Sequence, residues 1–573
     1  MNKWIAAVLV LGGTMLAGMA TSHAEESAEA DLILVNGEVV TLAANPERAE
    51  AVAIRGDRIV ALGGSDEIEA LAGPGTERID LGGRMLLPGF IEGHGHFLGF
   101  GEALMTLDLQ DTASFAELVK KVEAAVADVN PGEWIIGRGW HQENWNETGD
   151  DVIDGVPRHD ALSEVSPDNP VLLTHASGHA ALANQAAMTL GGIAAQTPDP
   201  DGGEIVRDAD GNPTGYLRQA AQRPVREVMR RWFEGMGELE RDERLRRQVE
   251  LASEYALSHG ITSFHDQGQR FADIDRLRVL DEAGELPLRL YVAVIGETNT
   301  DLHRRLGDYL QPPEPGRMLT VRSVKRHFDG ALGTHGAWLL RPYEDRPDRS
   351  GLPQMSVADL RETATIAYQN GFQLNTHAIG DRANREALSI YESIYRLAGD
   401  ESLRWRIEHA QNVHPDDVPR FADLGVIASM QGIHATSDGP WVPQRLGEER
   451  ARRKAYVWRS LLDAGAVICN GTDVPVEPIS PIASLHASIT REMASGERFF
   501  PEQSMTRMEA LQSYTIHCAY AAFEEDRLGS IEVGKLADLV VVDRDLLEVS
   551  EEELAEAQVD LTLVGGEIRY RRD

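Results

Sequence analysis

Cysteine is nearly absent from this chain. Only Cys469 and Cys518 occur among its 573 residues. Two cysteines cannot form the disulfide framework of a small secreted domain, so the fold must depend on its hydrophobic core. The sequence does not show whether these two residues pair. A hydrophobic content of 42% is sufficient for a large core, and it excludes a disordered or fibrous chain.

Basic residues are also scarce. The chain has 55 lysines and arginines against 92 aspartates and glutamates, which gives a formal net charge of -37. A surface this acidic repels phosphate backbones and anionic lipids, so we expect no nucleic acid partner. The expected partner is a small-molecule substrate. The sequence leaves open whether the chain forms a homo-oligomer.

Long hydrophobic runs are absent except at the N-terminus. A short basic start at Lys3 is followed by an apolar run over residues 4–19 and by the small-residue triplet that ends at Ala24. This pattern predicts a signal peptide over residues 1–24, cleaved near Ala24, and a periplasmic or secreted mature protein. An uncleaved membrane anchor is the alternative. The run is short for a bilayer span, however, so we expect no stable membrane anchor.

Short strands at both ends of the chain predict one small β-sandwich domain. Residues 31–41 indicate two strands joined by an Asn-Gly turn, and residues 51–61 indicate a second pair of strands around Gly56-Asp57. Residues 538–543 and 559–570 have the same character. We therefore expect residues 25–84 and 523–573 to form this domain together.

The middle of the chain alternates strand-like and helix-like segments. Eight strand-like runs occur at 85–90, 261–265, 288–294, 321–325, 373–377, 404–409, 426–430 and 467–470. This alternation predicts an α/β fold with a (β/α)8 TIM-like barrel over residues 85–522. The interval 97–238 is too long for a loop. It follows the carboxyl end of a strand, so we expect it to be an insertion on the catalytic face of the barrel.

Histidines and acidic residues recur where the predicted strands end. His94 and His96 are separated by one residue, so both imidazoles point to the same side of an extended strand. His377, His409, Lys325 and Asp473 also lie at or just after strand ends. In a parallel barrel these ends converge on one mouth, so we predict that all six residues form a metal site.

Neutral imidazole and carboxylate ligands favour Zn²⁺, with Mn²⁺, Fe²⁺ or Ni²⁺ as alternatives. The sequence allows one ion or two. A cationic lysine would be repelled by a metal, so Lys325 can be a ligand only if it is deprotonated or carbamylated by CO₂. The alternative for Lys325 is a charged neighbour of the site.

Several motifs together resemble one family. They are LPGFIEGHGH at 87–96, KRHFDG at 325–330, NTHAIGDRA at 375–383, RIEHAQ at 406–411, GTDVP at 471–475 and GSIEVGKLADLVVVD at 529–543. The chain from about residue 31 onwards resembles the amidohydrolase superfamily, in the amidohydrolase-3 branch that includes N-substituted formamide deformylases. The resemblance implies hydrolysis of a non-peptide C–N bond, in a linear or cyclic amide, by metal-activated hydroxide.

The resemblance also implies a role for each metal-site residue. His94, His96 and Asp473 would bind the more buried ion. Lys325, if carbamylated, would bridge to a second ion bound by His377 and His409. Asp473 would in addition transfer a proton from the attacking hydroxide to the leaving nitrogen.

Three further residues are expected at the substrate. The segment 177–184 (SGHAALAN) is similar to one that covers the active site in this branch, so His179 is a candidate catalytic and substrate-binding residue. Family members commonly have Ser-Arg where this chain has Thr334-His335, and many have glutamate at the position of Gln219. Since His335 and Gln219 would line the pocket, these departures make a formamide-type substrate uncertain.

Two alternatives to amide hydrolysis remain at this point. The same metal motifs suit an esterase, a lactonase or an isomerase, because the same hydroxide attacks an ester carbonyl. A periplasmic binding or regulatory protein with a relict site is the other alternative. An intact ligand set argues against it.

Overall fold

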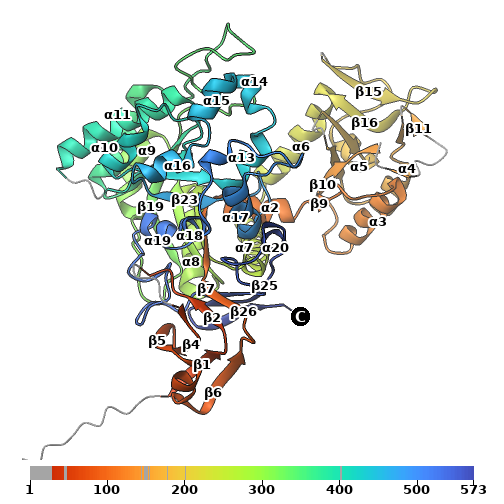
Figure 1. Cartoon of the computed structure of the whole chain (residues 1–573). Coiled ribbons are helices and arrows are strands. Elements are labelled where there is room, and N and C mark those ends of the chain that lie inside the picture. The colour runs from red at the N-terminus through yellow and green to blue at the C-terminus, as the bar shows by residue number, and fades with distance from the viewer. Residues whose placement is uncertain are drawn as a thin grey trace, which may run out of the picture.

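The computed structural model describes residues 29–43, 48–142, 145–146, 152–153, 155–176, 179–200, 202–399 and 403–572. The predicted signal peptide over residues 1–24 lies outside the described residues. Figure 1 shows three parts: a central barrel, a small β region below it that holds the first strands, and a side module to the right.

The central part is an eight-stranded parallel sheet whose strands pair in chain order and curl into a nearly closed barrel. Its strands are β8 (Phe90–Gly95), β17 (Ile261–Gln269), β18 (Arg289–Val294), β19 (Leu319–His327), β20 (Gln373–Ala378), β21 (Arg406–His409), β22 (Ile427–Gln431) and β23 (Ile468–Gly471). The predicted α/β fold with a (β/α)8 barrel is confirmed.

Helices connect the barrel strands and cover the outside of the sheet. They include α7 (Glu238–Ser258), α8 (Phe271–Ala283), α10 (Val357–Gln369), α11 (Asp381–Ala398), α12 (Val418–Leu424), α16 (Trp458–Asp463) and α17 (Pro481–Thr490). In α10, the Ser356 side chain caps the first turn by accepting from the Asp359 N–H. The apolar residues Leu360, Ala364 and Ala367 recur at helical spacing and are buried on one face of α10. This pattern gives each barrel strand a packed outer layer.

The two chain ends share a small β-sandwich, as the sequence predicts. One sheet has the order β5 (Arg58–Gly63), β4 (Ala51–Arg55), β1 (Ala30–Val35) and β6 (Ala72–Asp80). The other has the order β26 (Glu567–Arg571), β25 (Val559–Val564), β24 (Leu539–Val542), β7 (Met85–Pro88), β2 (Glu38–Val40) and β3 (Arg48–Ala49). Buried aliphatic residues from both ends, such as Leu34, Ile54 and Leu539, pack in one cluster. The six-stranded sheet therefore combines strands from both ends of the chain.

Residues 31–41 form two strands joined at Asn36-Gly37, as predicted, but β1 and β2 belong to different sheets, and the chain changes sheet at Asn36, whose φ is 59°. One local prediction is wrong. The run 85–90 is not the first barrel strand. It is divided at Pro88-Gly89 into β7, which pairs with β24, and β8, which begins the barrel. A continuous apolar run has no periodicity that could reveal such a division.

The side module lies within the interval 97–238. Its sheet has the order β15 (Gly203–Arg207), β16 (Pro213–Gln219), β14 (Ala180–Ala183), β13 (Val171–His175), β10 (Ile135–Trp140) and β9 (Leu107–Asp108). Helices α3 (Phe115–Val126), α4 (Asp160–Val165) and α5 (Gln185–Leu190) pack against it. Buried residues such as Trp140, Leu173 and Leu182 form a core that is separate from the barrel core. The module stands at one side of the barrel in Figure 1.

Cys469 on β23 and Cys518 on α19 (Ile516–Ala521) form a disulfide, with their Cα atoms 4.8 Å apart. Both cysteines are fully buried. The disulfide lies directly against Gly93 on β8: a Cβ atom at Gly93 would lie 2.4 Å from the Cys469 sulfur. The strand that carries His94 therefore requires glycine at position 93.

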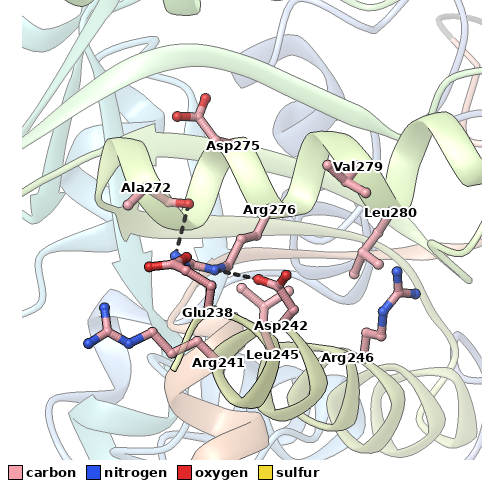
Figure 2. A pocket seen from close by; sticks show the side chains of 10 residues that line it. All are labelled: Glu238, Arg241, Asp242, Leu245, Arg246, Ala272, Asp275, Arg276, Val279 and Leu280. Atoms are coloured by element: carbon pink, nitrogen blue, oxygen red, sulfur yellow. Dashed lines mark hydrogen bonds and ion pairs between the residues drawn. The ribbon is translucent and has the colours of Figure 1, made fainter. Parts of the chain in front are cut away.

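None of the helices in the described part of the chain combines the length and the apolar character that crossing a bilayer requires. The outside of the barrel carries a groove of about 410 Å³ between α7 and α8. Figure 2 shows that charged side chains line it and that Arg276 points to Asp242, with 2.8 Å between the Arg276 Nε and the Asp242 carboxylate. This groove contains none of the predicted metal ligands.

Candidate metal centre

The barrel brings the predicted histidines to one place. His94 lies in β8 and His96 follows it, His377 lies in β20, and His409 is the last residue of β21. The ring centroid of His409 is 4.7 Å from that of His94 and 4.5 Å from that of His377. Residues more than 280 positions apart in the chain are thus in contact, because parallel strands end at the same rim.

Asp473 lies among these histidines. It follows β23 and has a φ of 60°, and its backbone N–H donates to the carbonyl oxygen of His94 over 2.7 Å. Its Oδ1 lies 3.1 Å from the Nε2 of His96 and 3.5 Å from the Nε2 of His94. Burial favours the neutral acid, but the two imidazoles hold the pKa of Asp473 well below its usual range. Asp473 is therefore an anion at neutral pH.

A fourth histidine, His434, belongs to the same cluster and was not predicted from the sequence. It lies in α13 (Gly432–Asp438), which begins directly after β22. Two groups of three residues have ligand atoms within 4.8 Å of one another: His94 with His96 and Asp473, and His409 with His434 and Asp473. The position just past a strand end is the signal that could have identified His434.

Several candidate ligand atoms in this cluster have no hydrogen-bond partner in the described part of the chain. Among the described residues, no hydrogen bond reaches His94 Nε2, His377 Nε2, His434 Nε2 or Asp473 Oδ1, although all four atoms are buried. Leaving buried polar atoms unsatisfied costs about 1–3 kcal/mol each. Acceptor atoms that converge without donors are what a bound cation requires. The residues present therefore fit a divalent transition metal.

The Nδ1 atoms of two of these imidazole rings are hydrogen bonded to other side chains. His94 Nδ1 is hydrogen bonded to Glu408, and His409 Nδ1 is 2.8 Å from the Oε1 of Gln431. Because carboxylate and amide oxygens only accept, each Nδ1 carries the hydrogen and each Nε2 keeps its lone pair. Partners of this kind orient metal-ligating histidines.

Glu408 is in turn held by Arg406. The Arg406 Nε donates to Glu408 Oε1 over 2.7 Å, and the same guanidinium reaches the carbonyl oxygen of Gly93 over 2.6 Å. Both side chains are completely buried. Burial would raise the pKa of Glu408, but Arg406 and His94 hold it well below its usual range. The sequence motif RIEH contained both residues without indicating these roles.

Lys325 lies in β19 and is buried, with 1% of its surface exposed. Burial lowers its pKa to about 8, against the opposing effect of the Glu408 and Asp473 carboxylates. A substantial fraction of Lys325 is therefore the neutral amine at mildly alkaline pH, and the neutral amine is the form that can ligate a metal or react with CO₂.

His377 faces a second buried carboxylate, Asp329. The His377 Nε2 is 3.7 Å from Asp329 Oδ1, which is too long for a hydrogen bond. Asp329 accepts hydrogen bonds from the backbone N–H groups of Ile379, Gly380 and Trp338. Burial raises the pKa of Asp329 to about 7. Burial also lowers the pKa of both His377 and His409 well below the usual range, so both imidazoles are neutral.

The three predicted substrate residues lie outside this cluster of contacts. His179 and Gln219 are exposed in the side module, where the Gln219 N–H donates to the His179 carbonyl oxygen over 2.7 Å. His335 lies in the segment after β19, with its Nε2 3.1 Å from both carboxylate oxygens of Asp345. Their contact with a substrate stays a prediction.

Comparison with known proteins agrees with this geometry. The chain is 33% identical over 502 residues to Protein LONG AFTER FAR-RED 3 of Arabidopsis thaliana, covering 85% of this chain and 82% of that protein. It is 31% identical over 497 residues to an N-substituted formamide deformylase of Arthrobacter pascens, covering 86% and 89%. A solved structure of an uncharacterized metal-dependent hydrolase from Pyrococcus furiosus matches with a TM-score of 0.71 and 29% identity, covering 90% of this chain and 100% of that one.

The amidohydrolase family model matches residues 77–570, which include the barrel, the side module and the β-sandwich strands β7, β24 and β25. Because this match covers most of the chain, the protein belongs to the amidohydrolase family.

Proposed function

We propose that this metal-dependent hydrolase cleaves a non-peptide C–N bond in a small amide. The observation that carries the proposal is that two groups of candidate ligands share Asp473, whose buried Oδ1 has no hydrogen-bond partner among the described residues. The buried Nε2 atoms of His94 and His434, one from each group, also have no hydrogen-bond partner there. A divalent cation bound there, which we expect to be Zn²⁺, would supply hydroxide at neutral pH and polarise the substrate carbonyl. One or two ions fit the ligand set.

Asp473 performs the proton transfer in this proposal. Its carboxylate is ionised, so it can accept a proton from the attacking water. It then donates that proton to the leaving nitrogen as the C–N bond breaks, which releases an amine and a carboxylic acid. The hydrogen bond from the Asp473 backbone N–H to the His94 carbonyl oxygen keeps this residue in place beside the histidines.

Lys325 has two proposed states. As a carbamate it would be an anionic ligand between two ions, and as an amine it would be a polar neighbour of Glu408 and Asp473. Mass spectrometry of the intact protein, prepared with and without bicarbonate, distinguishes the two states.

The proposed substrate class is the N-substituted formamides and related linear or cyclic amides. The support is the 31% identity to a formamide deformylase over 86% of this chain. His179, Gln219 and His335 are the proposed substrate contacts, with His179 also near the reacting carbonyl. Replacing each with alanine should raise KM for the preferred substrate.

The decisive experiment is a hydrolysis screen of purified, metal-analysed protein. Formamides, other amides, lactams, esters and lactones should be assayed side by side, before and after removal of metal by a chelator. We expect amide hydrolysis that disappears with the metal and returns when Zn²⁺ is restored. Ester or lactone hydrolysis without amide hydrolysis would exclude the C–N assignment. Turnover by metal-free protein would exclude the metal-dependent mechanism.

We also propose that the mature protein is periplasmic or secreted. The buried disulfide between Cys469 and Cys518 supports this, because disulfides persist mainly in oxidising compartments. N-terminal sequencing of exported protein should begin just after Ala24. An intact N-terminus on a cytosolic protein would contradict the proposal.

A further inference from the structure

Two arginines of the side module lie next to each other without an acidic partner. Arg138 lies on β10, where the strand register places it opposite Thr174 of β13. Arg226 lies on α6 (Arg223–Glu234), and its Nη2 donates to Thr174 Oγ1 over 3.0 Å, so its guanidinium reaches the row of the sheet that carries Arg138. Among the described residues, no carboxylate forms an ion pair with either arginine.

This pair lies where the apolar contacts of one sheet face end. Side chains alternate between the two faces of a strand, so Ile136 and Leu172, which are paired in the register, share the face of Arg138 and Thr174. Helix α6 covers that face, and its Val225 is fully buried in the same cluster as Leu172. Two cations therefore follow directly after the packed apolar row.

Neutral side chains hold the Arg226 guanidinium in place. Its Nε and Nη2 donate to Gln222 Oε1 over 3.2 and 2.9 Å. Gln222 is buried, and its Nε2 donates to the carbonyl oxygen of Gln219 over 3.4 Å. These contacts leave the Nη1 hydrogens of Arg226 without an acceptor in the described part of the chain. Donors that are fixed before a ligand arrives lose little entropy when it binds.

The two positive charges repel each other. Burial lowers the pKa of Arg226, and the nearby charge of Arg138 lowers it further. Other partly buried arginines of this chain have acidic partners, as Arg276 has in Asp242, at 2.8 Å. Moreover, a net charge of -37 repels anions from most of the surface. The arginine pair is therefore a place where an anionic group would relieve an existing repulsion.

We propose that Arg138 and Arg226 bind the carboxylate group of a small organic acid. The two oxygens of a carboxylate lie in one plane and match the planar N–H groups of guanidinium. One oxygen accepts from Arg226 Nη1 and the other from Arg138. The hydroxyl of Thr174, which has no acceptor among the described residues, is a further donor. The metal cluster contributes no residue to this site.

This carboxylate has two sources, the amide substrate itself and a separate organic acid. Gln222 connects Arg226 to Gln219, which the proposed function places at the substrate. In the view of Figure 1, α6 lies between the sheet of the side module and the barrel. The first source therefore rests on the proposed function and makes the substrate an amide that also carries a carboxylate. The second source does not depend on that function.

The test measures the binding of labelled succinate to the full-length protein by equilibrium dialysis. Succinate contains no amide bond, so it is not consumed, and 1,4-butanediol is the neutral compound of the same chain length. Because a carboxylate also binds metal ions, each measurement is made on metal-loaded and on metal-free protein. We expect succinate to bind to both forms, butanediol to bind to neither, and succinate binding to weaken as the salt concentration rises.

Variants of the chain test the assignment. Arg138 is exposed and has no hydrogen bond or ion pair with any described residue, so Arg138→Gln should fold like the wild type. It should weaken succinate binding by about 10- to 100-fold, the loss that a charge-assisted hydrogen bond implies. Arg138→Glu should abolish binding and raise the melting temperature, because its own carboxylate would pair with Arg226. Arg304 on α9 (Asn299–Arg305) is also exposed and unpaired among the described residues, so the control Arg304→Gln should leave binding unchanged.

A kinetic comparison identifies the source of the carboxylate. Two formamides of equal size, one ending in a carboxylate and the other in an alcohol, are assayed with the wild type and with Arg138→Gln. If the substrate carries the group, the variant should raise KM for the acidic formamide by about 10- to 100-fold and leave KM for the neutral one unchanged. If a separate acid is the ligand, both KM values should stay the same while succinate binding is lost.

Three results would overturn the proposal. Equal succinate affinity in the wild type and in Arg138→Gln would show that the arginine pair is not the site. Succinate binding that disappears with the metal would place the carboxylate at the metal cluster. Displacement of succinate by a lower concentration of inorganic phosphate would make phosphate the ligand. Succinate binding that depends on Arg138, without any amide hydrolysis, would refute the proposed function and leave the arginine site intact.

Discussion

The contact between Glu408 and His94 allows a quantitative prediction. In Glu408→Gln the side chain keeps its size but loses its charge and one acceptor oxygen. In the wild-type protein, the Oε2 of Glu408 accepts a hydrogen bond from His94 Nδ1, and its Oε1 accepts one from Arg406 Nε. The amide cannot serve both donors equally well, so the His94 ring loses its fixed orientation.

The expected effect is on metal affinity more than on stability. Loss of a partner that orients a metal-ligating histidine costs about 10- to 100-fold in affinity, or roughly 1.4–2.7 kcal/mol. Glu408→Ala should in addition lower the free energy of unfolding by about 3–5 kcal/mol, because it leaves the Arg406 guanidinium charged, buried and unpaired. Chelator competition measures the first quantity, and urea denaturation of the metal-free protein measures the second.

A matched control separates the two effects. Glu525 forms the same kind of two-point pair with Arg404, at 2.7 and 2.9 Å, but Arg404 precedes the start of β21, at the end of the strand opposite His409. Glu525→Gln should leave metal affinity unchanged. If Glu408→Gln lowers stability while its metal affinity stays equal to that of the wild type, Glu408 serves only Arg406 and the reasoning is refuted.

Asp473→Asn should lower kcat by about 10²–10⁴-fold while some bound metal remains, and undiminished turnover in a metal-loaded variant would contradict its proton-transfer role. Burial raises the pKa of Glu92 to about 8, so the folded state binds this proton more tightly than the unfolded chain does. The contribution of Glu92 to the free energy of unfolding therefore falls as pH rises from about 4.5 through 8. Glu92→Gln should flatten this decline, as measured by urea denaturation of the metal-free protein at several pH values. An unchanged pH profile would contradict the assignment to Glu92. Gly93→Ala should destabilise by at least about 1–3 kcal/mol, because its Cβ would lie 2.3 Å from the Asn470 carbonyl oxygen. In thermal denaturation, Gly93→Ala should melt at a lower temperature than the control Gly75→Ala, whose Cβ would meet nothing within 4 Å. Equal melting temperatures for the two variants would refute the argument.

The barrel could be predicted from the sequence because the patterns that indicate its strands and helices involve residues close together in the chain. Apolar runs, helical spacing and glycines at helix ends are properties of neighbouring residues, and they repeat in each strand–helix unit. The C-terminal cap at Gly425 shows this, since its φ of 63° is the left-handed conformation that glycine adopts readily. Where the signal was not periodic, as in the run 85–90, the prediction placed one strand where the chain has two.

Residue types and strand-end positions were enough to predict that His94, His96, His377, His409 and Asp473 are ligand candidates, because a parallel barrel places such ends at one rim. The tertiary structure alone decided which atoms face one another. It added His434 from α13, assigned Glu408 and Gln431 to the far sides of two imidazoles, and paired Cys469 with Cys518 behind Gly93. These contacts join residues that are distant in the chain, and no local pattern encodes them. They depend on how the strands and the helices that follow them pack together.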